Sequence, residues 1–395
     1  MKNHRSIISR IIAAALAIVL IFSFAACKKN DETNLTDANK ITLPEKKVAI
    51  LVAPEAQYPE DYRAAQELAA KYPDNIVVKE YPDSRILVAG DPQIMTLSEE
   101  LASDPTIGTI IYARATQFTS NAISKAKAKN PDIQTICIEP EESIDKISEL
   151  ANLVLCADWS AAANDIVTTA KDMGAKYFVV FSLNRHIVEN NMLAGANAAI
   201  KAACEAQGIT YIYDNAVDPN WAEKIPGAQK YIKEAVARLE LNEKIEGSDV
   251  ALFSTDSSVQ STLIEVANQK GMIYVSPSFP SAYNGAGEVY EAAMPTEIKD
   301  VKTYIKALKE AAAADTEGTA RISVYKFPLA STLLESAVYC AFDLLNGTTT
   351  AENLAANVTA RVNEAADEKK LTVGAYSEEL SNAFAAYCPG FEKIK

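Results

Sequence analysis

The chain has 395 residues, enough for two lobes of ordinary domain size. Its 52 acidic and 38 basic residues give a formal net charge of −14, which argues against nucleic acid or an anionic membrane face as a partner. Only two histidines occur, His4 and His186, so His-rich metal sites are excluded. The motifs HExxH, GxxxxGK[ST], GxGxxG and GxSxG are absent. We therefore expect no catalytic residue, no metal ligand and no cofactor.

The N-terminus has the order of an export signal. Basic residues precede an apolar run, Ile11–Phe24, which ends in Ala25-Ala26-Cys27. The run is short for a transmembrane helix, which needs about 20 apolar residues. We interpret residues 1–26 as a lipoprotein signal peptide and Cys27 as the lipidation site. A lipid with two acyl chains is enough for stable attachment, which predicts a cell-membrane protein held by its lipid on the extracytoplasmic face.

Residues 27–45 are interpreted as a tether, because they are polar and lack apolar periodicity. Five cysteines remain once Cys27 is lipidated, and no CxxC occurs. Cys137 and Cys156 lie inside apolar runs, where a thiol behaves as a small hydrophobe. Buried free thiols are the expectation, and a Cys137–Cys156 bond stays conceivable if the strands that carry them are neighbours.

From Lys46 onward, short apolar runs alternate with stretches of helical character. This alternation predicts parallel strands joined by crossover helices. The predicted strands are continuously apolar, as expected when helices cover both faces of a sheet. They are Val48–Ala53, Ile76–Tyr81, Ile107–Ala113, Ile133–Ile138, Leu153–Ala157, Tyr177–Ser182, Ile209–Tyr213, Val250–Ser254 and Met272–Ser276.

The predicted helices start at acidic or capping residues and end at Gly or Asn-Pro. They are Asp61–Ala70, Ser120–Lys129, Ser160–Met173, Asn190–Gln207 and Val259–Lys270. Five strand–helix units, a break near Ala157–Ser160 and four further units predict an α/β protein of two doubly wound parallel-sheet lobes joined by a hinge, rather than one sheet of nine strands.

The predicted domains are residues 46–158 for lobe one, 159–319 for lobe two, and about 320–346 for a segment that rejoins lobe one. That segment contains Arg321–Pro328, as a strand, and a helix over Leu329–Leu345. Residues 347–395 are predicted to form a helical C-terminal segment of undecided packing, with helices around Glu352–Ala366 and Ser377–Tyr387.

Two successive α/β lobes behind a lipoprotein signal resemble the type I periplasmic-binding proteins, which include sugar, amino-acid and nucleoside receptors of ABC importers. Three segments carry the resemblance: Lys47–Val52 opening lobe one, the crossing at Asp158-Trp159, and Ala251–Asp256 in lobe two. The return segment after Arg321 adds to it. More narrowly, the chain is similar to an uncharacterised group of Gram-positive lipoproteins of this fold, and this similarity supplies no ligand.

In doubly wound sheets, ligands bind beyond the carboxyl ends of the strands and at helix N-termini. We therefore searched the loops after strands one, three, six, eight and nine, together with the hinge. The candidate ligand-binding residues are Glu55, Tyr58, Arg114, Trp159, Asn184, Arg185, His186, Asp256 and Ser278.

Each candidate has an alternative role. Arg114 and Arg185 are suited to clamp a carboxylate or phosphate, and equally to form ion pairs inside the cleft. The rings of Trp159 and Tyr58 suit stacking on a ligand or packing at the hinge. Asp256 suits hydrogen bonding to ligand hydroxyls or an amine, or a helix N-cap. His186 is interpreted as a hydrogen-bonding residue of the cleft.

The sequence thus predicts an extracytoplasmic, lipid-anchored solute-binding protein that closes around a small molecule and delivers it to an ABC-type permease. Two alternatives stay open: a sensory binding protein that acts on a membrane receptor, and an extracytoplasmic hydrolase that uses Ser182 and His186. The arginines and aromatic residues favour an anionic or ring-containing ligand, such as a nucleoside, an amino-acid derivative or a small peptide. No nucleic acid partner is expected, and the lipid is the only expected contact with the membrane.

Overall fold

The computed structural model describes residues 41–55, 57–81, 93–188, 191–219, 223–241, 245–275, 281, 283, 285–366 and 371–395. The predicted signal peptide, Cys27, residues 28–40 of the tether and Ser278 lie outside the described residues. The chain divides into two units, Met1–Ile41 and Thr42–Lys395. All the structure that follows belongs to the second unit.

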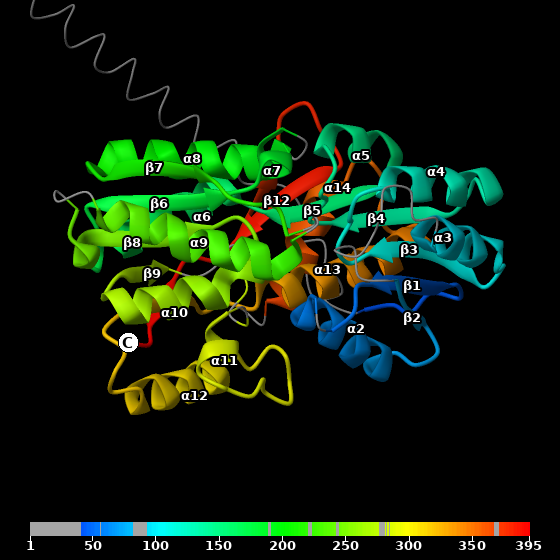
Figure 1. Cartoon of the computed structure of the whole chain (residues 1–395). Coiled ribbons are helices and arrows are strands. Elements are labelled where there is room, and N and C mark those ends of the chain that lie inside the picture. The colour runs from blue at the N-terminus through cyan, green and yellow to red at the C-terminus, as the bar shows by residue number, and fades with distance from the viewer. Residues whose placement is uncertain are drawn as a thin grey trace, which may run out of the picture. The chain divides into compact units, whose positions relative to one another are not determined.

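The first sheet has the strand order β11-β12-β5-β4-β3-β1-β2 (Figure 1). All its neighbouring strands pair in parallel except β11 and β12, which are antiparallel. Its strands are β1 (Lys47–Val52), β2 (Ile76–Glu80), β3 (Ile107–Tyr112), β4 (Gln134–Ile138), β5 (Leu153–Ala157), β11 (Thr372–Ala375) and β12 (Ala383–Tyr387).

Helices cover both faces of this sheet. One row packs side by side as α2 (Pro59–Lys71), α13 (Leu329–Leu345) and α14 (Leu354–Ala365), and the other as α3 (Gln93–Ser103), α4 (Thr119–Lys129) and α5 (Ile144–Leu150). This double cover explains the continuous apolar runs, because every residue of β3 and β5 is buried.

The second sheet has the order β13-β10-β9-β8-β6-β7, and only β13 runs antiparallel to its neighbour. Its strands are β6 (Tyr177–Ser182), β7 (Thr210–Asn215), β8 (Val250–Ser254), β9 (Ile273–Val275), β10 (Arg321–Tyr325) and β13 (Phe391–Lys393). The connections between them contain α6 (Trp159–Asp172), α7 (Asn184–Val188), α8 (Asn191–Gln207), α9 (Lys224–Glu240), 3-10 turns at Gly247–Asp249 and Ser257–Val259, α10 (Gln260–Lys270), α11 (Ala286–Val289) and α12 (Val301–Ala314).

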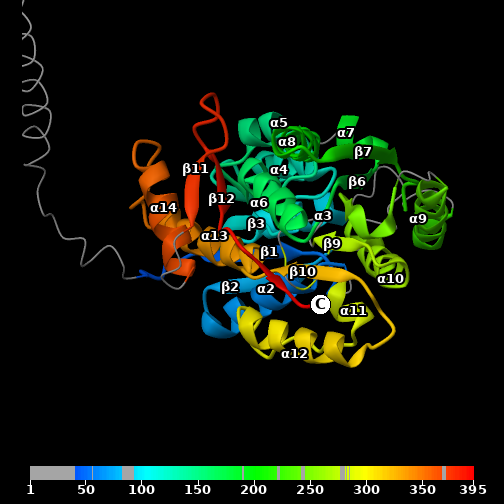
Figure 2. The ribbon, with the colours of Figure 1, turned by 90° about the vertical axis from the view of Figure 1, so that its left-hand side faces the viewer.

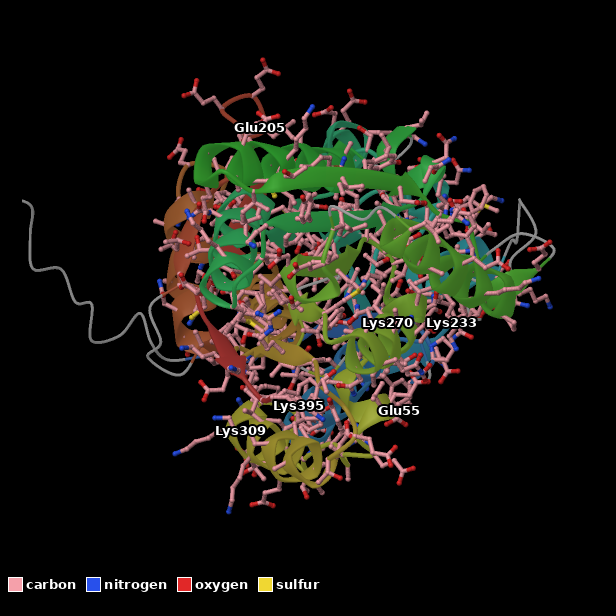
Figure 3. The ribbon with its side chains drawn as sticks, turned by 60° about the vertical axis from the view of Figure 1, so that its left-hand side comes forward. Glu55, Glu205, Lys233, Lys270, Lys309 and Lys395 are labelled. Carbon is pink, nitrogen blue, oxygen red and sulfur yellow. The ribbon has the colours of Figure 1, made fainter. Side chains whose placement is uncertain are left out.

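The predicted fold class is confirmed: two mainly parallel sheets lie in separate lobes, and each of the nine predicted strands forms. Charged side chains, such as Glu205 on α8 and Lys233 on α9, lie on the outer faces of the helices (Figure 3). The acidic composition is thus carried largely by solvated surfaces.

Two predictions about the last quarter of the chain are wrong. Arg321–Tyr325 does not rejoin lobe one as a strand, because β10 pairs with β9 in the second sheet, and it is α13 that returns to the first. The helix predicted over Ser377–Tyr387 is instead a turn followed by β12. Ala383–Tyr387 has the composition of a helix, but it pairs with β5 on one side and β11 on the other, and this tertiary context overrides helix propensity.

The described chain crosses between the lobes three times, between β5 and α6, between β10 and α13, and between β12 and β13 (Figure 2). The sequence predicted the first crossing and a return to lobe one, which it placed before Arg321 rather than after Tyr325, and it did not predict the third. Each lobe therefore contains an edge strand supplied by the C-terminal segment.

The five cysteines from Cys137 to Cys388 have free thiols. β4 and β5 are neighbours, but Cys137 is in register with Val154, which leaves Cys156 two residues further along. In the part of the chain that the structure describes, no helix combines the length and apolar character needed to cross a membrane.

Candidate functional site

The strand ends of lobe one gather around Arg114, which follows β3. Its Nη2 donates to Oδ2 of Asp61 at 2.8 Å, and both side chains are almost fully buried. The guanidinium lies over the ring of Tyr58, with its carbon 4.6 Å from the ring centroid. Burial raises the pKa of Asp61, and the charge of Arg114 opposes that rise. Asp61 begins the buried side of α2, so the helix holds the carboxylate against the end of β3.

The strand ends of lobe two gather around Arg185, which follows β6. Its Nε donates to Asp218 at 2.8 Å and its Nη2 to Asp256 at 3.3 Å. Asp256 also accepts a hydrogen bond from the backbone N–H of Ser258 at 3.0 Å, so it caps the following turn. Both roles that the sequence allowed for Asp256, the N-cap and a polar partner in the cleft, are therefore present in one side chain.

His186 lies beside this cluster and is 6% exposed. Its Nδ1 is 3.0 Å from Oγ1 of Thr255, which lies 2.8 Å from Oγ of Ser182. Burial, reinforced by the charge of Arg185, lowers the pKa of His186 to about 4. The imidazole is therefore uncharged at neutral pH and acts as a hydrogen-bonding group.

The two clusters face each other across the lobes. Burial raises the pKa of Glu141, in the loop after β4, and the charge of Arg185 in lobe two is the largest opposing influence, followed by that of Arg114. The hydroxyl of Tyr58 donates to Oε1 of Glu141 at 3.4 Å. Burial raises the pKa of Tyr58, and Asp256 of lobe two is among the charges that add to the rise. Loops from both sheets thus meet in one electrostatic network.

Glu139, immediately after β4, has the most unusual environment in this network. Its backbone φ is 48°, in the left-handed region that only a few per cent of non-glycine residues adopt. The side chain is 2% exposed, and Oε1 accepts a hydrogen bond from the backbone N–H of Ala157 at 2.5 Å. Oε2 accepts none from any described residue. Burial raises the pKa of Glu139 to about 8, although the charge of Arg114 opposes the rise.

Ala157 and Asp158 begin the first crossing, and beside them lies a hollow of about 420 Å³. Trp159 and Tyr376 contribute its aromatic rings. The lining residues come from the crossing, α8, β11 and β12: Ala157, Asp158, Trp159, Ser160, Gly195, Ala196, Ala375, Tyr376 and Ala385. Burial raises the pKa of the Tyr376 phenol, and Glu139 is one of the charges that add to this rise, so Glu139 lies within electrostatic range of the hollow.

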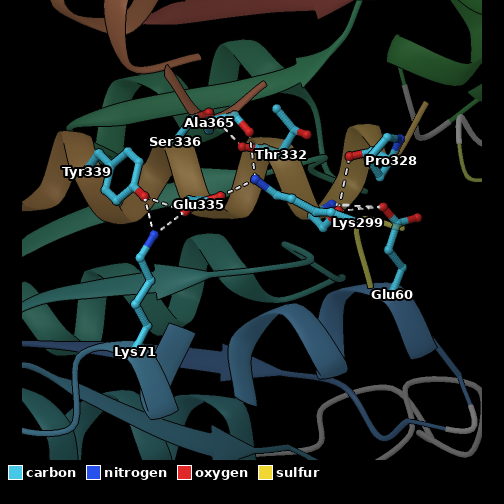
Figure 4. Close-up of polar contacts among 10 residues, drawn as sticks. Glu60, Lys71, Lys299, Pro328, Thr332, Glu335, Ser336, Tyr339 and Ala365 are labelled. Atoms are coloured by element: carbon cyan, nitrogen blue, oxygen red, sulfur yellow. Dashed lines mark hydrogen bonds and ion pairs between the residues drawn. The ribbon is translucent and has the colours of Figure 1, made fainter. Parts of the chain in front are cut away.

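A second polar cluster ties the connection between α11 and α12 to lobe one (Figure 4). We call residues Pro295–Lys299 the strap. Its Ile298 N–H donates to Glu67 of α2 at 2.8 Å, and the carbonyl of Pro295 accepts from Arg63. Lys299 pairs with Glu335 of α13 and donates to the carbonyl of Ala365 at 2.6 Å.

Glu335 also accepts from Lys71 at 3.0 Å and from the hydroxyl of Tyr339. A smaller hollow of about 260 Å³ lies beside these residues. Lys71, Lys299 and Glu335 pair among themselves, so this cluster fastens elements of the fold together.

The nine candidate residues divide into four groups. The structure brings together Tyr58, Arg114, Arg185, His186 and Asp256, and it places Trp159 at the neighbouring hollow. Glu55 pairs with Arg63 at an exposed position, and Asn184 is exposed at the start of α7. Ser278 lies outside the described residues. Both arginines are already paired with carboxylates, which favours the ion-pair alternative over an open anion clamp.

Sequence reasoning missed five carboxylate and hydroxyl groups of the network: Asp61, Glu139, Glu141, Asp218 and Thr255. The signal for Glu139 and Glu141 was available, because Glu139-Pro140-Glu141 directly follows β4, whose carboxyl end lies between those of β3 and β5. Within the described ranges, no group of three or more His, Cys, Asp or Glu side chains is arranged to hold a metal ion.

Comparison with known proteins supports the same architecture. Residues 46–323 match the model of a family described as a protein of unknown function, DUF3798. Two uncharacterised proteins of Treponema pallidum (strain Nichols) are also similar. The first is 29% identical over 119 residues, 30% of this chain and 55% of the relative, and the second is 30% identical over 118 residues. The chain thus spans about half the length of the curated relatives it matches.

Among solved structures, a putative transcriptional regulator from Clostridium difficile 630 aligns with a TM-score of 0.66 at 17% identity, over 89% of this chain and 100% of that one. An ABC transporter solute binding protein from Clostridium phytofermentas, with bound L-rhamnose, aligns with a TM-score of 0.54 at 12% identity, over 88% of this chain and 96% of that one.

These likenesses and the two sheets define a type I periplasmic-binding-protein-like fold, as the sequence led us to expect. The family model covers most of the chain, and the protein therefore belongs to the DUF3798 family.

Proposed function

We propose that this protein is an extracytoplasmic, lipid-anchored solute-binding protein whose lobes close around a small molecule and present it to an ABC-type permease. The observation that carries the proposal is the electrostatic interaction between Glu141 of lobe one and Arg185 of lobe two, since the charge of each shifts the pKa of the other. A ligand that contacts charged groups of both lobes binds the closed form more tightly than the open form, and only such a difference in affinity lets binding drive closure.

The fold and the N-terminal sequence support this proposal from two sides. The Clostridium phytofermentas neighbour of the same fold is an ABC transporter solute binding protein with a bound sugar. The predicted signal peptide and Cys27 would deliver the binding lobes to the outer face of the cell membrane, where such a protein meets its solute.

A thermal-shift screen tests the proposal. The protein is heated with sugars, nucleosides, amino acids, organic acids and amines, and each compound is recovered and analysed by mass spectrometry. A ligand at a hundred times its Kd stabilises the folded state by about 2.7 kcal/mol. We expect one class to raise the melting temperature and to be recovered unchanged.

The Glu141→Gln variant shows whether the shift comes from this site, and Glu149→Gln, at an exposed position of α5, is its matched control. The shift should shrink in the first variant and persist in the second. Consumption of the compound, or no shift with any class, would contradict the proposal.

A further inference from the structure

The 420 Å³ hollow beside the first crossing lies at a distinctive place in the fold. The β11–β12 hairpin extends the first sheet beyond β5, and α6 packs against β12 there (Figures 1 and 2). Residues of α8 line the opposite side. Its volume falls in the range of small-molecule sites, which is roughly 300–1,000 Å³.

Small residues keep this space open between two aromatic rings. Gly195 and Ala196 on α8 face Ala375 and Ala385 on the hairpin, and larger side chains at these positions would fill the hollow. Trp159 is 6% exposed and Tyr376 is half-buried, so both rings are held in place by their surroundings. Aromatic faces present negative electrostatic potential to a ligand, and Trp presents the strongest.

The charge around the hollow is also negative. Asp158 is the one charged residue among the described residues that line it. The N-terminus of α6 contributes a partial positive charge of about +0.5. Asp158 already caps that end, accepting from the backbone N–H of Ala161 at 3.0 Å, and its full negative charge outweighs the helix dipole.

Glu139 is not among the residues that line the hollow, but it holds the backbone of one of them. Its Oε1 holds the N–H of Ala157, a lining residue, and its Oε2 accepts no hydrogen bond from a described residue. Because burial raises the pKa of Glu139 to about 8, its carboxyl group is protonated at neutral pH and adds no charge, so Asp158 is the charged group of the hollow.

We propose that this hollow binds an organic ammonium ion, with its cationic group between the rings of Trp159 and Tyr376 and its charge balanced by Asp158. Neither Glu141 nor Arg185 lines this hollow, so the inference goes beyond the proposed function and names a second site. It replaces the expectation of an anionic ligand, because Arg114 and Arg185 are each neutralised by carboxylates of their own cluster.

Choline and its uncharged isostere 3,3-dimethyl-1-butanol are the probes that separate charge from shape. The full chain in a non-ionic detergent is titrated with each, and binding is read from tryptophan fluorescence. The chain has two tryptophans, so the Trp221→Phe background leaves Trp159 as the only reporter. We expect a saturable change with choline, and no response to the isostere at the same concentrations.

Calorimetry on two variants of Tyr376 then locates the site. Tyr376→Phe keeps the aromatic face and should bind choline with a Kd within about twofold of the parent's. Tyr376→Leu removes the face, and cation–π contacts of roughly 1–2 kcal/mol predict a 5- to 30-fold weaker Kd. Circular dichroism confirms that both variants fold.

The outcomes separate this inference from the proposed function. Equal binding of choline and its isostere, equal loss in both Tyr376 variants, or no saturable response to choline or to putrescine, a primary diamine, would overturn the inference. A sugar or organic acid that stabilises the protein while these amines do not would overturn the inference and leave the proposed function standing.

Discussion

Glu139 combines two energetically unfavourable features, a left-handed backbone conformation and a buried carboxyl group. Strained residues persist only where the surrounding structure determines their conformation, and they concentrate at binding sites. Here the hydrogen bond from Ala157 links the end of β4 to the first crossing, so the residue connects the strand-end network of lobe one with the segment that leads into lobe two.

The raised pKa of Glu139 predicts a pH-dependent stability. The carboxyl group binds its proton up to about pH 8 in the folded protein, and only to its ordinary pKa of 4.5 when unfolded. The folded state therefore holds more protons between these values, and the free energy of unfolding falls as the pH rises through them. Glu60, whose pKa burial raises to about 7, contributes in the same direction.

Glu139→Gln keeps a neutral acceptor for Ala157 and cannot ionise. We expect the variant to lose less stability than the parent between pH 5 and pH 8, by on the order of a few kcal/mol. Urea unfolding at several pH values measures this, with exposed Glu149→Gln as the control. Parallel profiles for Glu139→Gln and the parent would show that Glu139 does not titrate in this window.

At the residue scale, the sequence identified both arginines of the network, Arg114 and Arg185, but it missed most of the carboxylates around them. Arg114, Arg185 and Asp256 follow strands in loops that were searched. Asp61 lies on α2, where an acidic residue in the first turn is explained by the helix dipole alone. Nothing in the sequence shows that α2 packs its first turn against the end of β3.

At the scale of elements, α2 is an interface along its whole length. Glu60, Arg63, Glu67 and Lys71 are spaced by three or four residues and so lie on one helix face. Glu60 accepts hydrogen bonds from Ser281 and Ser331, while Arg63 and Glu67 contact the strap. This polar face joins the β9–β10 connection to lobe one, and at Glu60 it also holds the start of α13, just after the second crossing.

The strap should therefore contribute to stability. Lys299→Met removes the donor to Ala365 and leaves Glu335 with Lys71 as its remaining cation. We expect the free energy of unfolding to fall by roughly 1–3 kcal/mol. Urea denaturation measures the change, and Lys302→Met, at an exposed position of α12, is the matched control. Equal effects of the two substitutions would show that the strap bonds add nothing.

The helices and strands were predictable where the pattern of apolar residues agreed with the residues that begin and end each element. Leu329–Leu345 is a helix with the predicted bounds, and Leu153–Ala157 is a strand with the predicted bounds. The C-terminal strands were not predictable, because β12 is rich in alanine and becomes a strand only through pairing with β5. Local composition holds no information about that partner.

At the scale of the whole molecule, the two-lobed fold and the return of α13 to lobe one were predicted, while the places of β10, β12 and β13 were not. Strand order in a sheet depends on contacts between distant segments, and those contacts leave no trace in local sequence. The localisation of the protein stays a prediction from the first 27 residues.

Lipid attachment at Cys27 gives that prediction a direct test. Cells that express the protein are grown with an alkyne analogue of palmitate, and the protein is separated into membrane and soluble fractions. We expect label and membrane association in the parent, and loss of the label in Cys27→Ser. Cys388→Ser is the control, since this cysteine lies far along the chain from the predicted signal peptide. An unlabelled parent would contradict lipidation.

The positions of β12 and β13 have a consequence for biosynthesis. β12 completes the β5 edge of the first sheet, and β13 completes the β10 edge of the second. A chain that emerges from its N-terminus keeps both edges unpaired until residues 371–395 follow. Neither sheet can therefore be completed until the last residues of the chain have been synthesised.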